Sequence, residues 1–333
     1  MRLPAVNEFF VRALRLLCGS DKTHTILLKR GLKIRKLKDS YTSDKPKLDL
    51  HGKKTLVYMA DGKWMHGGNT DRFRGMVSAF DFAEKHGMNF RIFHISPFPL
   101  QEILVPNDVD WIISEDELSY NSDEAKPVLL YRDDFDNIRA LEKQTESSHH
   151  QYHLYSCIDS VGERFPKLFH RLFKPSTLLE KQILHYRQVL GTKYLSVSFR
   201  FQNLLGDYQE YQFKELDANG KERLGQAAIS ALDKICLDNP EYEKILVTAD
   251  SPSFLSKLSS DSRFIIVSGE SKHIDFNPNQ GPENFTKAFV EFFLISGAQK
   301  AILYSNRKFH TYPSNFPKYA ARLGNIPFQV FQD

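Results

Sequence analysis

The sequence predicts an α/β protein built from two Rossmann-like halves that face each other across a cleft. Short apolar runs typical of strands alternate with amphipathic helical segments along most of the 333 residues. This alternation is the pattern of a parallel, doubly wound sheet. It occurs on both sides of a less regular stretch at 133–175, and the length suits about two domains at ~150 residues each.

The first half is expected to begin with a strand that runs through a glycine-rich turn into a helix. In that helix Phe73, Met76, Val77, Phe80 and Ala83 recur at helical spacing, and a glycine suited to a C-cap follows at 87. The predicted elements, in order, are a strand at 55–60, a helix at 71–86, a strand at 89–95, a short helix at 100–104, an apolar run at 109–113 and a strand at 128–131. We expect further helices in 133–175.

The second half is more regular, because every predicted strand is followed by a helical segment or a polar loop. Helices are predicted at 177–190, 221–236, 252–258, 283–297 and 317–323, and strands at 193–201, 244–249, 263–267, 300–304 and 328–330. We therefore divide the chain into a leader (1–50), a first Rossmann-like half (51–175) and a second one (176–333).

Composition narrows the class of protein. Hydrophobic residues make up 41% and charged residues 26%, which is ordinary for a globular domain. Three distant cysteines form no disulfide framework, which favours a reducing, cytoplasmic location. No apolar run approaches the ~20 residues of a membrane span.

The net charge of +4 is concentrated in the leader. Residues 1–50 hold 12 Lys/Arg and 5 Asp/Glu, so they carry +7, and the other 33 basic and 36 acidic residues sum to −3. Because the body lacks a basic stripe, we expect no nucleic-acid partner. The leader is either a peripheral contact with the inner face of an anionic membrane or a solvated segment packed loosely on the body.

The glycine turn is the first candidate site. Gly67, Gly68 and Asn69 lie in the turn after the strand at 55–60, and Asp71 and Arg72 begin the helix that follows. A helix N-terminus after a glycine turn presents backbone N–H groups to an anion. This arrangement predicts a nucleotide or sugar-phosphate ligand.

Polar residues also follow the strands of the second half, where ligands bind in open α/β sheets. Arg200 ends the strand at 193–201, and its planar guanidinium suits a diphosphate, with an internal salt bridge as the alternative. His273 and Asp275 are candidates for reading a nucleobase edge or are ordinary loop residues. The remaining candidates are Asp250, Ser251, Ser314, Asn315 and Phe316, for which helix capping is the alternative at the aspartate and the serines.

A metal site is not expected. His149, His153 and Cys157 would share one face if their segment were helical, but no further ligand lies at suitable spacing. The sequence also contains no P-loop, GxGxxG, GxSxG or HExxH motif.

Taken in order, these motifs resemble the fucosyltransferase superfamily with a GT-B fold, which includes bacterial α1,2- and α1,6-fucosyltransferases and protein O-fucosyltransferases. The residues 67–73 resemble its glycine turn. The family motif His-x-Arg-x-x-Asp reads Ser198-Phe199-Arg200-Phe201-Gln202-Asn203 here. Thr248-Ala249-Asp250 matches a Thr-x-Asp strand end, and Ser314-Asn315-Phe316 matches the last motif, Ser-x-Phe.

The resemblance implies an inverting transfer of fucose from GDP-fucose to a glycan, with no cofactor and no essential metal. It implies that Arg200 grips the diphosphate with help from Ser314 and Phe316, and that Asn69 lies near the β-phosphate or the sugar. The first half would bind the acceptor, a surface polysaccharide, and the second half the nucleotide sugar. A base must assist the attacking hydroxyl group, and our candidates are Asp207 and Glu270.

Two departures from the family motifs leave alternatives open. Ser198 and Asn203 stand where the family has histidine and aspartate. The alternatives are a non-catalytic nucleotide- or carbohydrate-binding protein of the same fold and a transferase that uses another nucleotide sugar.

Overall fold

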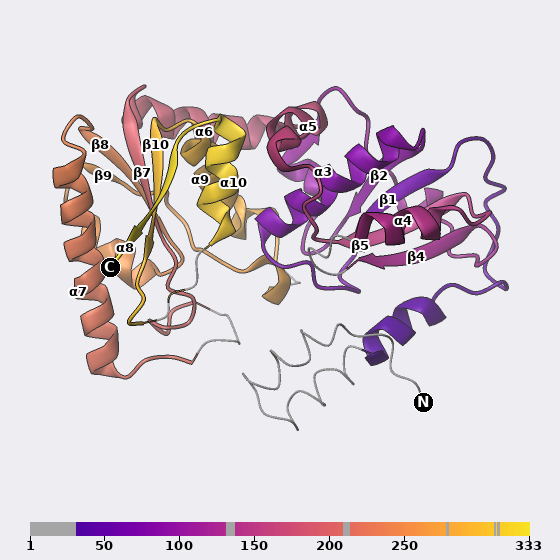
Figure 1. The fold of residues 1–333 in the computed structure, drawn as a ribbon, viewed down its shortest axis with the longest axis horizontal. Helices are drawn as coiled ribbons and strands as arrows, with labels where there is room; N and C mark the ends of the chain where they lie inside the picture. Colours follow the sequence, from indigo (N-terminus) through magenta and orange to yellow (C-terminus); the bar gives the residue numbers. More distant parts are fainter. Residues whose placement is uncertain (1–30, 131–136, 209–213, 278–279, 310, 312–313) are drawn as a thin grey trace.

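The computed structural model describes residues 31–130, 137–208, 214–277, 280–309, 311 and 314–333. These residues form two parallel sheets, each flanked by helices, with the first sheet and its helices on one side of the molecule and the second sheet on the other (Figure 1). The α/β class and the parallel sheets predicted from the sequence are therefore confirmed.

The first sheet has the strand order β2-β1-β5-β4, and all its pairs are parallel. Its strands are β1 (Thr55–Ala60), β2 (Asn89–His94), β4 (Ala125–Leu130) and β5 (Gln151–Ser156). Helices α3 (Asn69–Lys85), α4 (Asn137–Thr145) and α5 (Phe165–Leu172) belong to this half. Short pieces complete it: η1 (Leu100–Glu102), η2 (Glu115–Glu117), η3 (Gly162–Arg164), and β3 (Leu104–Pro106) paired antiparallel with β6 (Phe173–Pro175).

Strand β5 corrects one expectation. Helices α4 and α5 lie in 133–175, as expected from the sequence, but residues 151–156 form a strand between β1 and β4 that was not expected. Every residue of β5 is buried, so its polar side chains lie inside the sheet layers and hide the alternation that marks a half-exposed strand. Because the segment is extended, His149, His153 and Cys157 do not share a helical face. Among the described residues no group of three or more His, Cys, Asp or Glu side chains is arranged to hold a metal ion.

The second sheet has the order β11-β10-β7-β8-β9 and is also fully parallel. Its strands are β7 (Tyr194–Phe199), β8 (Lys244–Ala249), β9 (Phe264–Ile265), β10 (Lys300–Ser305) and β11 (Phe328–Gln332). Helices α6 (Thr177–Leu190), α9 (Thr286–Ser296) and α10 (Asn315–Gly324) lie toward the first half, and α7 (Ala218–Asp238) and α8 (Pro252–Leu258) cover the other face (Figure 1). Two short turns, η4 (Ile274–Phe276) and η5 (Pro282–Asn284), precede α9.

One apolar core joins the two halves. It contains residues of both sheets and of α3, α5, α9 and α10. The ring of Phe73 in α3 lies 5.2 Å from that of Phe292 in α9, centroid to centroid, and Phe98 lies 5.3 Å from Phe285. Burial of large aromatic rings contributes about 1.5–3 kcal/mol per side chain, so this contact holds the halves in a defined relative position.

The described part of the leader is packed on the first half. Residues 31–39 form a helix, from which Leu37 enters a small core with Val57 and Trp64. The hydroxyl group of Tyr41 lies 2.7 Å from Nδ1 of His153 in β5. Residues 31–41 are therefore anchored to the body, while residues 1–30 lie outside the described part. In the described chain no helix is both long and apolar enough to span a membrane.

Candidate functional site

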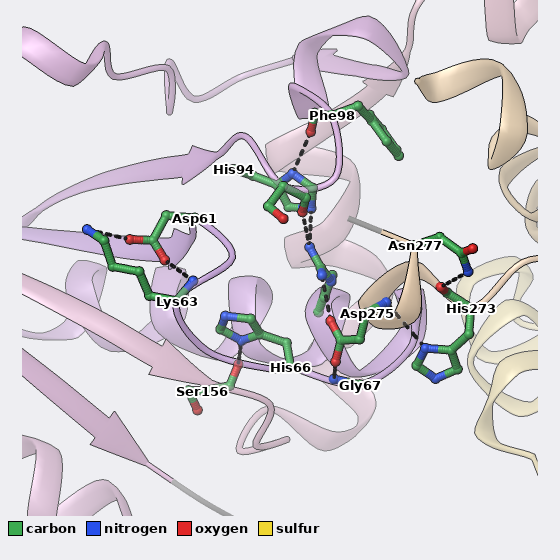
Figure 2. Close-up of polar contacts among 12 residues, drawn as sticks. Asp61, Lys63, His66, Gly67, His94, Phe98, Ser156, His273, Asp275 and Asn277 are labelled. Atoms are coloured by element: carbon green, nitrogen blue, oxygen red, sulfur yellow. Dashed lines mark hydrogen bonds and ion pairs between the residues drawn. The ribbon is translucent and has the colours of Figure 1, made fainter. Parts of the chain in front are cut away.

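The glycine turn is closed by a carboxylate from the other half of the molecule. The backbone N–H of Gly67 donates to Oδ2 of Asp275 over 2.6 Å, and Figure 2 shows this carboxylate reaching the turn from the η4 segment. Gly67 has a φ of +90°, and a Cβ there would lie 2.4 Å from Oδ2 of Asp71, so glycine is required. The Gly67 N–H group, which was predicted to bind a ligand anion, donates to an internal carboxylate, and its role toward a ligand stays a prediction.

Arg72 supplies the cationic part of the same site. Its Nη2 atom lies 2.7 Å from Oδ1 of Asp275, and its Nη1 atom contacts Nε2 of His94 at 2.8 Å and the Ser96 carbonyl at 2.7 Å. The Arg72 and Asp275 side chains are only 5% and 3% exposed. Such a buried pair needs further hydrogen bonds to offset its desolvation, and His94 and Ser96 provide them.

Several buried polar atoms at this turn have no hydrogen-bond partner among the described residues. They are Nε2 of His66, Oδ1 of Asn69, Oγ1 of Thr70 and Nε of Arg72. Leaving a buried polar group unpaired costs about 1–3 kcal/mol, so a cluster of such atoms indicates a missing polar partner. Because all four lie within seven consecutive residues, the start of α3 is the strongest ligand-site candidate in the described chain.

Arg200 lies at the carboxyl end of β7 and forms the internal ion pair that we named as its alternative. Its Nη1 atom lies 2.7 Å from Oδ2 of Asp250, with side-chain exposures of 20% and 6%. The carboxylate also accepts the backbone N–H groups of Phe201 and Gln202, each at 2.8 Å. Asp250 therefore stabilises the turn after β7 through these hydrogen bonds. Arg200 is oriented by Asp250 and by the Tyr208 ring, 4.7 Å away, and keeps contact with solvent.

Asp207 and Ser251 lie together at the start of α8. Oδ2 of Asp207 accepts hydrogen bonds from the hydroxyl groups of Ser251 and Ser253 and from the Ser253 N–H, at 2.6–3.0 Å. Ser251 in turn caps α8 by accepting from the Phe254 N–H. Capping, the alternative considered for Ser251, is what the structure shows. Oδ1 of Asp207 has no partner among the described residues.

The other base candidate, Glu270, is on the surface. Its side chain is 70% exposed and pairs with Lys272 at 3.0 Å. As bases, Asp207 and Glu270 remain sequence-based predictions.

Three candidates surround the first turn of α10. Ser314 is the N-cap and accepts from the Phe316 N–H at 3.1 Å. Asn315 is exposed, and the Phe316 ring packs on Phe292 of α9 with centroids 5.5 Å apart. Helix capping at Ser314 is observed, and the exposed start of α10 leaves the phosphate role as a prediction. Residues 312–313 lie outside the described part of the chain.

Ser198 and Asn203 occupy different surroundings. Ser198 is buried in β7 and accepts a hydrogen bond from Oγ1 of Thr248 in β8 at 2.8 Å. Its hydroxyl group therefore links β7 and β8 inside the sheet. Asn203 is half-buried in the turn after β7, and its carbonyl accepts the Gly206 N–H. Only Asn203 is on the same loop as Arg200.

His273 connects the two candidate cations. Burial is the main reason that the pKa of His273 is lowered to about 4; the charge of Asp275 opposes this shift, and the charges of Arg200 and Arg72 add to it. The charges of the arginine after β7 and of the arginine in α3 therefore both affect the pKa of this imidazole. Hydrogen bonds join Gly67, Arg72, His273 and Asp275, which are up to about 200 residues apart in sequence. The tertiary structure does not bring Glu270 into hydrogen-bond contact with this group.

Sequence reasoning missed His66 and His94. Both lie beside the glycine turn in space. Each is a single histidine in the sequence, and single histidines are too common to indicate a site. Burial lowers the pKa of His94 well below its usual value, and Arg72 lowers it further. Their positions in the sequence could have indicated them, because His94 ends one strand of the first sheet and His66 follows another.

No family model matches the sequence, and no curated protein matches it. Solved structures do match the fold. NodZ α-1,6-fucosyltransferase soaked with GDP-fucose is 15% identical, with a TM-score of 0.53 over 82% of this chain and 93% of that chain. FUT1 of Arabidopsis thaliana in complex with GDP is 12% identical, with a TM-score of 0.56 over 97% of this chain and 78% of that chain. NodZ from Bradyrhizobium is 16% identical, with a TM-score of 0.52 over 81% of this chain and 92% of that chain.

At these identities the likeness concerns the fold. It extends over most of this chain and includes both sheets. The chain has the fold of fucosyltransferase structures.

Proposed function

We propose that this protein is a glycosyltransferase that moves fucose from GDP-fucose to a glycan acceptor, with inversion and without an essential metal. One observation carries the proposal: buried polar atoms without partners cluster at the glycine turn, at residues 66–72, in a chain with the fold of GDP-binding fucosyltransferase structures. A sugar diphosphate offers acceptor oxygens and hydroxyl groups to such atoms. The acceptor is proposed to be a surface polysaccharide on the cytoplasmic side.

Arg200 and the start of α3 are proposed to stabilise the leaving GDP during transfer. Charge develops on the β-phosphate as GDP leaves, and donors fixed at that position stabilise the transition state. Arg200, held by Asp250 and Tyr208, and the N–H groups at the start of α3 supply those donors. Asn69 is placed to contact the phosphate or the sugar. The nucleotide is thus proposed to bind the second half with its diphosphate reaching the start of α3, and the acceptor to bind the first half.

The Asp275 carboxylate has to leave the Gly67 N–H when a phosphate binds there, because one N–H group cannot serve two anions. GDP binding therefore involves the η4 segment as well as the glycine turn. Ser314 and Phe316 at the start of α10 are proposed to complete the nucleotide site.

A non-catalytic binding protein is the second candidate, and one observation favours it. Ser198, which stands where the family motif has histidine, is buried and bonded to Thr248 rather than directed toward a ligand. A transferase for another nucleotide sugar is the third.

Calorimetric titration with GDP, UDP and CDP, followed by GDP-fucose turnover in EDTA, separates these candidates. We expect GDP to bind and GDP-fucose to release GDP with EDTA present. Binding of UDP alone would contradict the donor, and GDP binding without any release with water or glycan acceptors would favour the non-catalytic protein. Loss of turnover in EDTA would contradict the metal-independent mechanism.

One variant and a matched control test the site at the glycine turn. Asn69→Ala removes an unpaired buried acceptor oxygen that can bond only to a hydroxyl or N–H group of the nucleotide, and we expect GDP affinity to fall by up to roughly tenfold, as for a neutral hydrogen bond. Asn107→Ala is the matched control, since its exposed amide bonds only to the carbonyl of His170, far along the chain from the turn. Equal affinities for both variants would place the ligand elsewhere.

A further inference from the structure

His66 is a buried histidine with one bonded and one unpaired ring nitrogen. Its Nδ1 atom lies 3.4 Å from the carbonyl oxygen of Ser156 and 3.2 Å from the hydroxyl group of Tyr58. Its Nε2 atom has no partner in the described part of the chain, although the residue is only 4% exposed. Figure 2 shows the ring beside Gly67, with Nδ1 directed at Ser156.

The partners of Nδ1 determine which nitrogen carries the proton. A carbonyl oxygen can only accept a hydrogen bond, so the bond to Ser156 requires the proton on Nδ1 and the lone pair on Nε2, whereas the Tyr58 hydroxyl group can bond to either tautomer. Burial, and next the charge of Arg72, lower the pKa of His66 to about 4. The ring is therefore neutral above this pH, and with the proton on Nδ1 its Nε2 atom is a proton acceptor, which the lowered pKa makes weaker than an ordinary imidazole.

Other buried histidines of this half are different. In His153, Nδ1 bonds to Tyr41 and Nε2 to Gln151, at 2.7 and 3.0 Å. In His94, Nε2 bonds to Arg72 and Nδ1 to the carbonyl of Phe98. These rings are structural, because both nitrogens are satisfied inside the protein.

A ligand can reach the space beside His66 only if a lining side chain moves, because this space is too small for a water molecule. The residue lines a narrow recess together with Trp64, Met65, Leu130, Ser156 and Cys157. Met65 is 41% exposed and Cys157 is half-buried, so these two members of the lining border solvent. Methionine is a flexible side chain that can move aside for a ligand, and aromatic walls such as Trp64 are common in ligand pockets.

We propose that Nε2 of His66 accepts the proton of the hydroxyl group that attacks the donor sugar. This inference rests on the proposed function. The hydroxyl oxygen forms a bond to the anomeric carbon, and the bond from that carbon to the β-phosphate oxygen breaks, its electron pair leaving with GDP. The hydroxyl proton passes to Nε2, and the imidazolium then releases it to solvent.

The position of His66 in the chain supports this role. It directly precedes Gly67, whose N–H group is an anion donor, so the proton acceptor and the phosphate site are on consecutive residues. Its side chain lies against β1 and β5 of the first half, through Tyr58 and Ser156, which is the half proposed to bind the acceptor. By contrast, Oδ2 of Asp207 is used by serine donors of α8, and Glu270 lies on the surface with Lys272.

His66→Gln tests the inference, with His153→Gln as the control for removing a buried imidazole. For each full-length variant we would measure the melting curve, the dissociation constant of GDP and the rate of GDP release from GDP-fucose with water as acceptor. We expect His66→Gln to bind GDP within threefold of wild type and to lose about 10²–10⁴ in rate, the usual contribution of a general base. His153→Gln should keep the wild-type rate.

The outcomes separate this inference from the proposed function. If wild type binds no GDP, the proposed function fails, and the base assignment fails with it. If GDP binds and the rate of folded His66→Gln stays within threefold of wild type, the base assignment alone is wrong.

A second measurement is independent of folding of the variant and of turnover. Nitrogen NMR of the wild-type chain should show an unprotonated Nε2 on His66 at neutral pH. A proton on Nε2 would overturn the inference even in an active enzyme.

Discussion

Arg72 and Asp275 form a buried ion pair that joins the two halves of the molecule at the glycine turn. The distance from Nη2 to Oδ1 is 2.7 Å, and both side chains are almost fully enclosed. Arg72 belongs to α3, and Asp275 to the η4 segment before α9. The pair therefore links the predicted anion site of one half to the loop that follows the sheet of the other.

Asp275→Asn should raise the affinity for GDP, because it removes the negative charge that competes with a phosphate for the Gly67 N–H. We expect a change of roughly tenfold, equivalent to about 1.4 kcal/mol. The variant should also be less stable, since Arg72 loses its buried counter-ion. Calorimetry and urea unfolding measure the two effects. Asp81→Asn, in the ion pair with Lys85 on α3, is the control for losing a carboxylate, and weaker GDP binding by Asp275→Asn would contradict competition.

Removing Arg200 should destabilise the protein more at high pH than at low pH. Burial raises the pKa of Asp250 in the folded state, and Arg200 opposes this shift. A raised folded pKa means that stability is complete below the unfolded value and is lost as the pH rises through the folded value. In Arg200→Met the folded pKa rises further, so the loss extends to higher pH.

Urea unfolding of Arg200→Met at pH 5 and pH 8 measures this difference. Arg263→Met is the control, because its partner Asp261 lies on the surface and exposed pairs contribute little. A pH-independent loss of stability in Arg200→Met would show that Asp250 does not depend on the guanidinium.

Acid should destabilise the protein between about pH 6.5, the ordinary value for histidine, and pH 4. Burial lowers the pKa of His66 and His273 to about 4 and of His153 to about 3. Because these folded values lie below the unfolded one, stability is complete above the unfolded value and is lost as the pH falls toward the folded values. Each such histidine contributes about 1.4 kcal/mol per pH unit within the window.

The free energy of unfolding measured from pH 7 to pH 4 gives this slope. His153→Gln should make it shallower, since one titrating group is removed. His170→Gln, at an exposed histidine, should leave it unchanged, and an equal slope in all three proteins would contradict the assignment.

Gly75→Ala should destabilise the protein strongly because α3 passes very close to β5 at this residue. An added Cβ would lie 2.2 Å from the backbone carbonyl oxygen of Ser156, and neither backbone can move without disturbing the core. We expect a loss of about 1–3 kcal/mol or more in urea unfolding. Gly225→Ala is the control: its nearest neighbour is the Lys257 amine at 3.6 Å, so alanine should stabilise α7 by about 0.5–1 kcal/mol.

The basic helix at residues 31–39 should bind anionic vesicles. Lys33, Arg35, Lys36 and Lys38 are exposed, while Leu37 is buried against the body. Each basic residue near an anionic surface contributes about 1 kcal/mol, so replacing all four by glutamine should abolish flotation with anionic vesicles. Neutral vesicles are the control. Flotation that survives the substitution would show that these four residues are not the contact.

Removal of residues 1–50 is not a clean test of this contact, because Leu37 and Tyr41 would be lost from the core as well. Truncation before residue 31 preserves both side chains and is the better comparison.

Local sequence patterns determined the class of the fold and most of its elements. The helix after the glycine turn, the strands β7, β8 and β10, and the caps Ser251 and Ser314 were predicted because each depends on residues within a few positions of one another. The same patterns located Gly67, Arg72, Arg200 and Asp275 at strand and helix ends. Strand β5 was missed because both of its faces are buried, so its sequence shows no two-residue alternation.

The tertiary structure alone decided which charges meet. Arg200 is paired with Asp250, fifty residues later, and Asp275 fills a turn more than two hundred residues earlier. Whether a nitrogen of His66 remains unpaired depends in the same way on Ser156 and Tyr58, which reach it only through the packing of β1 beside β5. Periodicity and propensity act along the chain, whereas the pairing of buried polar groups depends on how separate elements pack, and the sequence pattern contains no local record of that packing.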